Sequence, residues 1–403
     1  MAVRLLHFEA GGFVHPIYRE QMHALPVGWE IASPHPGLLD SDGGTPLIQG
    51  QGARLRGARE LAERIALRFL GRTGHVRLGQ ATPDPGVALT HSAELLLGDP
   101  DVPYVVDFEH VNCFVLYQEI ALSRPRALRR LRAAVEDERC RYLLPWCDAA
   151  RERFLTAIGP ESAARVAPKT VTVPPAIRPV AERPAQRGAG PLRVLFVGTK
   201  FFEKGGVEAI RAVERLSSSH DVRLDMLSYV PAEWDARLAE HPTVTTHRPG
   251  SGRELVERLY ADSDVLLFPS HMDTFGYVVL EAAAHGVPAV AADHHAMPEL
   301  IDDGETGLLF ECENPLYVED GRCAFDHVLP PPRSYMDALQ RPSDGYVDRI
   351  ASQLARIAED AAMHGRLASG ALERVRAGAF SIERRRELLA DLYDAAASSR
   401  RAA

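Results

Sequence analysis

The sequence predicts an α/β fold with two Rossmann-like, parallel-sheet domains that face a cleft. Short apolar runs rich in β-branched residues alternate with segments of helical periodicity along most of the chain, which is typical of parallel sheets covered by helices on both faces. A proline-rich stretch near the middle separates two strand–helix series of similar size. A chain of 403 residues also exceeds the usual size of one hydrophobic core, so we expect two domains.

The first half carries three expected strands and two expected helices. The expected strands are VRLLHFEA (3–10), PYVVDFEH (103–110) and RYLLPW (141–146). Apolar residues at helical spacing predict helices over 53–70 and 124–139. The second helix starts at a proline and carries its arginines before its acids. Contact with a membrane surface or an acidic acceptor is one interpretation, and a solvated helix face is the one we favour.

A linker and a second strand–helix series follow. We divide the chain into a first domain over 1–175, a linker over 176–191, a second domain over 192–379 and an amphipathic terminal helix over 380–403. The strands expected in the second domain are 192–198, 222–230, 263–270 and 287–293. The irregular text over 312–346, with its triple proline, predicts an excursion. It is either a lid or, as we favour, surface decoration.

The composition argues against several classes of protein. Hydrophobic residues make up 46% and charged residues 25% of the chain, as in an ordinary globular protein. The net charge of −9 gives no support to a nucleic-acid partner. Five cysteines without a C-x-x-C pair predict free thiols, and the pair His294–His295 lacks a third ligand, so we expect no metal. No apolar run approaches the roughly 18 residues of a membrane span, so we expect a cytoplasmic protein.

The stretch HMDTFGYVVLEAAAHGVPAV (271–290) has the features of a ligand site. A buried strand precedes it, and YVVLEAAAHG has the pattern of a helix closed by glycine. The turn between them offers backbone N–H groups and the positive end of a helix dipole, where phosphate binds readily. Gly276 allows close approach of a ligand, while Asp273 and Glu281 can accept hydrogen bonds from hydroxyl groups. The alternative is that Asp273 caps the helix and Glu281 is a partly exposed helix residue.

A second strand–turn–helix unit lies over 192–213. Its connection contains Gly198, Lys200, Lys204 and Gly205, and forms neither a Walker loop nor a dinucleotide-binding glycine turn. The chain has only three lysines among its 46 basic residues, and two of them are here. Because an ammonium beside a helix N-terminus suits a diphosphate, we expect at least one of them to contact phosphate.

These two segments resemble those of the retaining, nucleotide-sugar-dependent glycosyltransferases of family four, which have the GT-B fold. The family's E-G-F-G-x-x-x-x-E-A-x-A-x-G-x-P-V-V is matched by DTFGYVVLEAAAHGVPAV, and MPELIDDGETGLLF (297–310) is similar to its continuation. FVGTKFFEKGG is similar to the family's G-R-L-x-x-x-K-G, and VPYVVDFEH to a first-domain strand that ends in a histidine. The likeness is dense over the second half and patchy over the first. It implies that the terminal helix crosses back to the first domain.

The resemblance also implies roles for individual residues. Asp273 is expected to face the hydroxyls of the donor sugar, Glu281 the nucleotide ribose, and Lys204 the diphosphate. His110 is expected at the donor sugar and the reaction centre, the alternative being a histidine satisfied at a strand end. Backbone contacts with the sugar or the phosphates are implied for Thr274, Phe275, Gly276, Gly11 and Gly12.

The sequence departs from the family pattern at three places. Asp273 replaces a glutamate and is shorter by one methylene, and Thr199 replaces an arginine of the phosphate pair, for which Lys200 is the substitute if that charge is kept. His295 and Ala296 stand where paired glycines are usual. Of the neighbouring acids, strand alternation predicts that Glu109 faces away from the cleft. Glu299 in the PEL turn is expected to cap the next helix.

The function implied by the resemblance is a hexosyl transfer with retention. A nucleotide-diphosphate sugar is the co-substrate, a hydroxyl group of unknown identity is the acceptor, and neither a metal nor another cofactor is needed. Two other enzyme activities stay open, a sugar-nucleotide epimerase and an inverting transferase. A non-catalytic sugar-nucleotide-binding subunit also stays open because of the departures at Asp273 and Thr199.

Overall fold

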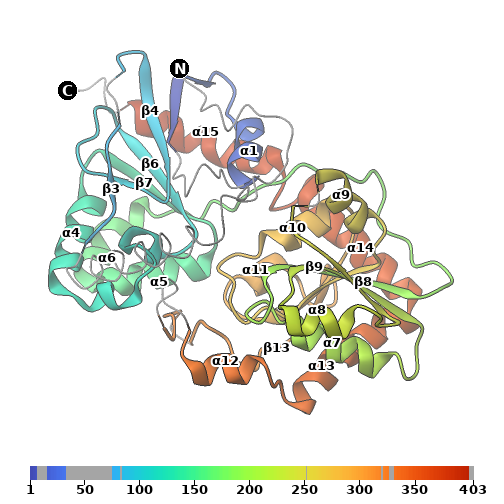
Figure 1. Ribbon diagram of the computed structural model, residues 1–403. Helices are drawn as coiled ribbons and strands as arrows, with labels where there is room; N and C mark the ends of the chain where they lie inside the picture. The colour runs from blue at the N-terminus through green and yellow to red at the C-terminus, as the bar shows by residue number, and fades with distance from the viewer. Residues whose placement is uncertain are drawn as a thin grey trace.

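The computed structural model describes residues 1–6, 16–32, 75–81, 84–250, 252–318, 321–325 and 331–398. In these residues the chain forms two large parallel sheets flanked by helices, which confirms the fold class expected from the sequence (Figure 1). The expected helix over 53–70 lies outside the described residues, as do Gly11 and Gly12.

The first domain is built on a five-stranded parallel sheet. In spatial order its strands are β2 (Glu30–Ile31), β1 (Ala2–Leu6), β4 (Val87–Ala93), β6 (Tyr104–Phe108) and β7 (Cys140–Pro145). A separate parallel pair consists of β3 (Leu78–Gly79) and β5 (Leu96–Leu97). The α-helices are α1 (Pro16–Gln21), α4 (Pro125–Glu136), α5 (Asp148–Ile158) and α6 (Pro160–Val166). Short 3₁₀ helices are η1 (Met22–Ala24), η2 (Val111–Val115), η3 (Glu119–Ser123) and η4 (Ala167–Lys169).

Burial on both faces explains why the central strands are apolar runs. All five residues of β6 are buried, as expected for a parallel strand between two layers of helices. Helix α4 buries Ala127, Leu131 and Val135, whereas Arg129 and Arg130 are exposed. The arginine-rich segment is therefore an amphipathic helix with its apolar stripe in the domain core.

The second domain is built on a six-stranded parallel sheet. In spatial order its strands are β10 (Val244–His247), β9 (Val222–Tyr229), β8 (Leu192–Lys200), β11 (Val265–Phe268), β12 (Ala289–Asp293) and β13 (Gly307–Glu311). The helices are α7 (Gly206–Leu216), α8 (Ala232–Leu238), α9 (Arg253–Ala261), α10 (Tyr277–Ala284), α11 (Met297–Leu300), α12 (Arg333–Leu339), α13 (Asp344–Glu359), α14 (Ala361–Arg376) and α15 (Ile382–Ser398). The expected strands over 192–198, 222–230, 263–270 and 287–293 are all present.

Six strands in the described part of the chain were not expected from the sequence. Three of them, β2, β3 and β5, are only two residues long. The longer three are β4, β10 and β13, and each lies inside or at the edge of a sheet whose neighbouring strands were expected. The excursion over 312–346 contains α12 and also contacts the first domain, because Gly321 and Cys323 meet His110 and Asn112. It is therefore an interdomain connection rather than surface decoration.

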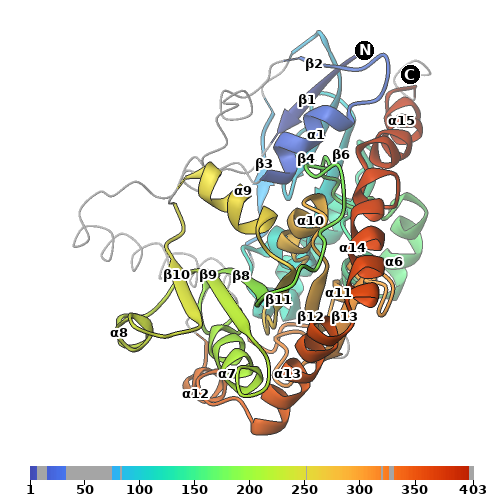
Figure 2. The same ribbon diagram turned by 90° about the vertical axis from the view of Figure 1, so that its right-hand side faces the viewer.

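The terminal helix α15 returns to the first domain, as the resemblance implied. Figure 2 shows α14 and α15 in succession along one side of the molecule, leading from the second sheet to the first. Tyr393 Oη lies 2.5 Å from His91 Nδ1 on β4. The buried Arg385 donates to Val173 O at 3.0 Å and lies 3.5 Å from Asp107 of β6. These contacts hold helix α15 against the core of the first domain.

Candidate active site

The strand order places a crevice between β8 and β11. From β8 the chain adds β9 and then β10 on one side, and afterwards returns to add β11, β12 and β13 on the other side. The connections at the carboxyl ends of β8 and β11 therefore diverge, and in open α/β sheets ligands bind at such a switch point. The two connecting turns meet here, since the N–H of His271 donates to Glu203 O at 3.0 Å.

Helices α7 and α10 both begin at this crevice with a glycine. The N-caps are Gly205, at φ +82°, and Gly276, at φ +84°, and neither helix has a side-chain hydrogen bond to its cap. A Cβ on Gly205 would lie 2.2 Å from Pro269 O, and one on Gly276 would lie 2.4 Å from Met297 Cε. Glycine is needed here for left-handed backbone and for space, and both helix N-termini lack a side-chain cap. The alternative that Asp273 is the N-cap of α10 is wrong.

Lys204 and Asp273 meet at the junction of the two turns. Lys204 Nζ donates to Met272 O at 2.7 Å and to Asp273 Oδ2 at 2.5 Å. Gly198 makes room for this lysine, because a Cβ at Gly198 would lie 2.7 Å from Lys204 Cβ. Burial raises the pKa of Asp273, but the charge and hydrogen bond of Lys204, followed by His294 and the Gly276 N–H, outweigh burial and leave the pKa below its ordinary value. Asp273 is thus an ionised carboxylate.

A buried ion pair holds the second turn against α7. His271 Nε2 lies 2.8 Å from Glu208 Oε1, and both side chains are buried. Burial lowers the pKa of His271, but its contacts with Cys312 and Glu208 outweigh burial and raise the pKa to about 10. The imidazolium and the carboxylate therefore fix the Asp273 turn relative to the helix that follows Lys204.

Glu281 lies in the second turn of α10 and is partly buried. Its Oε2 accepts a hydrogen bond of 2.9 Å from Tyr260 Oη. Burial raises the pKa of Glu281 to about 7, against the lowering effect of Tyr260. This carboxyl can accept hydrogen bonds from hydroxyl groups when it is ionised.

On the first domain, His110 follows β6 and caps η2. Its Nδ1 accepts from the N–H of Asn112 at 3.2 Å, and its Nε2 lies 3.2 Å from Gly321 O of the excursion. The ring is therefore satisfied, as one interpretation of the sequence held. Both contacts fit one tautomer, with the proton on Nε2, since a carbonyl oxygen only accepts.

Glu109 lies directly after β6, which ends at Phe108, so strand alternation does not fix the direction of its side chain. Burial, Glu94 and Asp273 raise its pKa well above the ordinary value, while a hydrogen bond with Tyr117 and the charge of Lys204 lower it. The expectation that Glu109 faces away from the cleft stays a prediction.

The excursion brings an aromatic side chain into this group. Tyr317 Oη donates to Thr274 Oγ1 at 3.1 Å, and its ring stacks on His295 with centroids 4.1 Å apart and planes at 16°. His295 has φ +50°, a conformation that favours glycine. His294 Nε2 lies 2.7 Å from Ser270 O, and burial lowers its pKa to about 4. Tyr317 and His294 carried no sequence signal of a site, since their contacts come from distant turns.

Two further contacts hold the domains together beside the site. The Phe275 ring packs edge-on against Trp146 of the first domain, with centroids 5.8 Å apart. Glu299 accepts from the N–H groups of Asp148 and Ala149 at 2.7 and 2.9 Å. It therefore caps a helix, as expected, but the helix is α5 of the first domain rather than the next helix in the chain.

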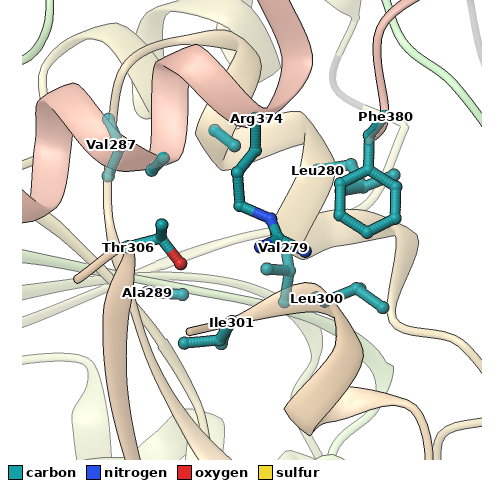
Figure 3. A pocket seen from close by; sticks show the side chains of 11 residues that line it. Val279, Leu280, Val287, Ala289, Leu300, Ile301, Thr306, Arg374 and Phe380 are labelled. Carbon is teal, nitrogen blue, oxygen red and sulfur yellow. The ribbon is translucent and has the colours of Figure 1, made fainter. Parts of the chain in front are cut away.

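A cavity of about 630 Å³ lies between α5 and the turn that follows β12. Its lining includes Glu152, Arg153 and Thr156 from the first domain, and His295 and Tyr317 from the second. A much smaller cavity of about 10 Å³, shown in Figure 3, lies between α10 and α14 and is lined by apolar side chains, Thr306 and Arg374. Only the larger cavity has room for an organic ligand.

Several expectations concern residues away from this junction. Lys200 ends β8 with an exposed side chain, and its carbonyl oxygen accepts from the N–H of Lys204 at 2.9 Å, so the ammonium that meets Asp273 is that of Lys204. All five cysteines are free. Within the part of the chain that the structure describes, no three His, Cys, Asp or Glu side chains gather as metal ligands would. No helix there has the length and apolar character to span a membrane.

Comparison with known proteins places this site in a wider group. Residues 191–320 match the family model described as glycosyl transferases group 1. D-inositol 3-phosphate glycosyltransferase of Corynebacterium diphtheriae is 32% identical over 197 residues, which are 43% of this chain and 45% of that protein. Glycogen synthase of Mycobacterium tuberculosis is 31% identical over 124 residues, 30% of each chain. This chain spans less than half the length of these curated relatives.

Solved structures extend the likeness to the whole fold. Sucrose-phosphate synthase of Thermosynechococcus elongatus aligns over 99% of this chain and 100% of its own, with a TM-score of 0.59 and 14% identity. Anabaena HepE, solved with UDP and glucose, aligns over 98% of this chain and 100% of its own, with a TM-score of 0.57 and 14% identity. At such identities the likeness establishes the fold, which is GT-B.

Proposed function

We propose that the protein moves a hexosyl group from a nucleotide-diphosphate sugar to an acceptor hydroxyl, because residues 191–320 match the family model of the group 1 glycosyltransferases. We further propose that the reaction retains the anomeric configuration and needs no metal. The observation that carries the proposal is the junction of α7 and α10, where two glycine N-caps without side-chain caps flank Lys204 and Asp273.

The junction suits a diphosphate because its positive groups converge. The N-termini of α7 and α10 present backbone N–H groups and dipole ends, and Lys204 supplies a full charge. Such fixed groups stabilise the negative charge that grows on a departing nucleoside diphosphate. Lys204 releases Asp273 when it turns to the phosphates. Lys200, Gly198 and, by the family resemblance, Gly11 and Gly12 complete the proposed phosphate surroundings.

The sugar and the nucleotide are assigned to opposite ends of α10. At the helix N-terminus, Asp273 accepts hydrogen bonds from the sugar hydroxyls. Backbone groups of Thr274, Phe275 and Gly276 make further hydrogen bonds with the sugar. His110 approaches the sugar from the first domain. Glu281, one turn further into the helix, accepts from the ribose diol, for which an ionised carboxylate is a suitable acceptor.

In the proposed step the acceptor oxygen attacks the face of the anomeric carbon from which the diphosphate leaves. The bond between that carbon and the diphosphate oxygen breaks with its electron pair on the diphosphate. The proton of the acceptor hydroxyl passes to a diphosphate oxygen, so no side-chain base is required. Closure of the two domains excludes water and favours transfer over hydrolysis.

The test is release of nucleoside diphosphate from a panel of nucleotide sugars, in the presence of a chelator and with candidate polyol acceptors. Turnover with Lys204→Met reduced at least about tenfold supports the assignment. The matched control is Arg223→Met, which removes an exposed cation on β9. Nuclear magnetic resonance of the product gives its anomeric configuration. No turnover with any donor, or an inverted product, would contradict the proposal.

A further inference from the structure

A short segment links the two domains at the sugar end of the site. We call it the strap and define it as Pro315–Val318 and Gly321–Cys323. On the second domain, the N–H of Leu316 donates to His271 O at 2.7 Å. On the first domain, Gly321 O lies 3.2 Å from His110 Nε2, and Cys323 Sγ lies 3.2 Å from Asn112 Nδ2.

The strap places Tyr317 between the residues assigned to the donor sugar. Its hydroxyl donates to Thr274 Oγ1 at 3.1 Å, and its ring centroid lies 5.3 Å from that of His110. The Tyr317 ring also stacks on His295 at 4.1 Å. A phenol and a hexose are similar in size, so both cannot lie between Thr274 and His110 at once.

Tyr317 is not arranged as a platform on which a sugar could stack. Such a platform needs an accessible ring face, and only 4% of Tyr317 is exposed. Its hydroxyl is engaged by Thr274, and its ring contacts the imidazoles of His110 and His295. Tyr317 therefore lies at the edge of the larger cavity with little accessible surface of its own.

His294, whose ring lies beside that of Tyr317, has a buried nitrogen without a hydrogen-bond partner in the part of the chain that the structure describes. Its ring is nearly parallel to that of Tyr317, at 19° and 6.4 Å. Its Nε2 meets Ser270 O at 2.7 Å and so carries the proton, which leaves a lone pair on Nδ1. That Nδ1 is buried and has no hydrogen-bond partner among the described residues. Buried polar atoms are rarely left unpaired without a functional reason.

We infer that Tyr317 occupies the donor-sugar subsite in the unliganded protein and leaves it when a nucleotide sugar binds. The inference rests on the proposed function and names the residue that controls sugar entry. Withdrawal of the strap frees Thr274 Oγ1 and His110 Nε2 for hydroxyl groups. A free nucleoside diphosphate does not require the withdrawal, because it is assigned to Lys204 and Glu281.

The apparent affinity for the nucleotide sugar is then the intrinsic affinity multiplied by the fraction of molecules in which the strap is withdrawn. Tyr317→Ala removes the phenol and should strengthen binding of the nucleotide sugar by about tenfold relative to the matching diphosphate. Tyr317→Phe keeps the ring but loses the bond to Thr274, and should give a smaller gain. The matched control is Val318→Ala, the neighbouring strap residue, whose side chain is 40% exposed.

Calorimetric titration measures both ligands. The probes are UDP with UDP-glucose, GDP with GDP-mannose and ADP with ADP-glucose, and the pair whose diphosphate binds tightest is carried forward. A gain confined to the sugar nucleotide supports the inference. An unchanged ratio of the two affinities, or a loss confined to the sugar nucleotide, overturns it. If none of the six ligands binds, the proposed function fails together with the inference.

A second variant tests the same idea and leaves Tyr317 in place. Asn112→Cys places a thiol against the native Cys323, whose sulfur lies 3.2 Å from Asn112 Nδ2, so that oxidation ties the strap to the first domain. The oxidised variant should bind the diphosphate normally and lose the nucleotide sugar by at least about tenfold. Dithiothreitol should restore binding, and adding Cys323→Ser should abolish the effect. Equal binding before and after oxidation would overturn the inference.

Discussion

Replacement of Lys204 by methionine tests the centre of the proposed site. The substitution keeps most of the aliphatic stem and removes the ammonium, which donates to Met272 O and Asp273 Oδ2. The side chains of Lys204 and Asp273 are 19% and 16% exposed. Asp273 then stays in the cleft as a carboxylate without its cation, and its pKa rises.

The expected loss of stability follows from this partial burial. Breaking a fully buried pair by removing one partner costs about 3–5 kcal/mol, and an exposed pair contributes about 0–1 kcal/mol. For a pair at this depth we expect the free energy of unfolding to fall by about 1–2 kcal/mol. Urea denaturation measures this change. Because Asp273→Asn removes the stranded charge, the double variant should recover most of the loss.

Binding separates the proposed role from a purely structural one. A hydrogen bond to a charged group contributes about 1.5–3 kcal/mol, so Lys204→Met should weaken nucleoside diphosphate binding by about 10- to 150-fold. Asp273→Asn releases the lysine from its partner and should strengthen binding of the free diphosphate while slowing sugar transfer. If Lys204→Met stays folded and binds the diphosphate within about twofold of the native protein, where Arg223→Met sets the baseline, the phosphate assignment is refuted.

Three more predictions follow from single contacts. Burial raises the Glu281 pKa from 4.5 to about 7, so the free energy of unfolding should fall by up to about 3 kcal/mol as the pH rises through that range. Urea denaturation of Glu281→Gln should not show this fall. Between pH 6 and 8 the affinity for the nucleoside diphosphate should rise by about tenfold more in the native protein than in Glu281→Gln. Protonation of the ligand affects both proteins equally, so the difference reports Glu281. Equal pH dependence in the two proteins would contradict the ribose assignment. Gly276→Ala should lower the free energy of unfolding by about 1–2 kcal/mol, because its φ is +84° and its Cβ would crowd Met297; an unchanged denaturation midpoint would contradict this. Glu299→Ala should lower it by about 1 kcal/mol through loss of the cap on α5, whereas Pro298→Ala at the exposed neighbouring position serves as control.

Most of the sheet could be predicted because buried parallel strands are continuous apolar runs. The three longer strands that were missed lack this signal. β4 contains Thr90, His91 and Ser92, which are buried, and His91 meets Tyr393 across 302 positions of the sequence. β10 is a half-buried edge strand, and β13 begins at a glycine that lies against the backbone of β12. In each case tertiary contacts, which are not visible locally, decide the strand.

The same distinction between local and tertiary signals applies to the residues of the site. Lys204, Asp273 and Gly276 could be placed from the sequence because each belongs to a local strand–turn–helix unit, and the sheet order then brings the two units together. Tyr317 could not, since 43 positions separate it from Thr274. The direction of the Glu109 side chain could not be predicted by alternation, because β6 ends one residue earlier at Phe108.

Two of the three departures from the family pattern lie on the sugar side of the junction. On the phosphate side Thr199 replaces an arginine, but Lys204 is present and the N-termini of α7 and α10 have no side-chain caps. On the sugar side, Asp273 is the shorter acid and already pairs with Lys204, and His295 adopts φ +50° against Tyr317. A diphosphate must take Lys204 from Asp273, and the freed carboxylate can then accept a sugar hydroxyl. Under the proposed function, binding of the two halves of the donor is therefore coupled through the Lys204–Asp273 pair.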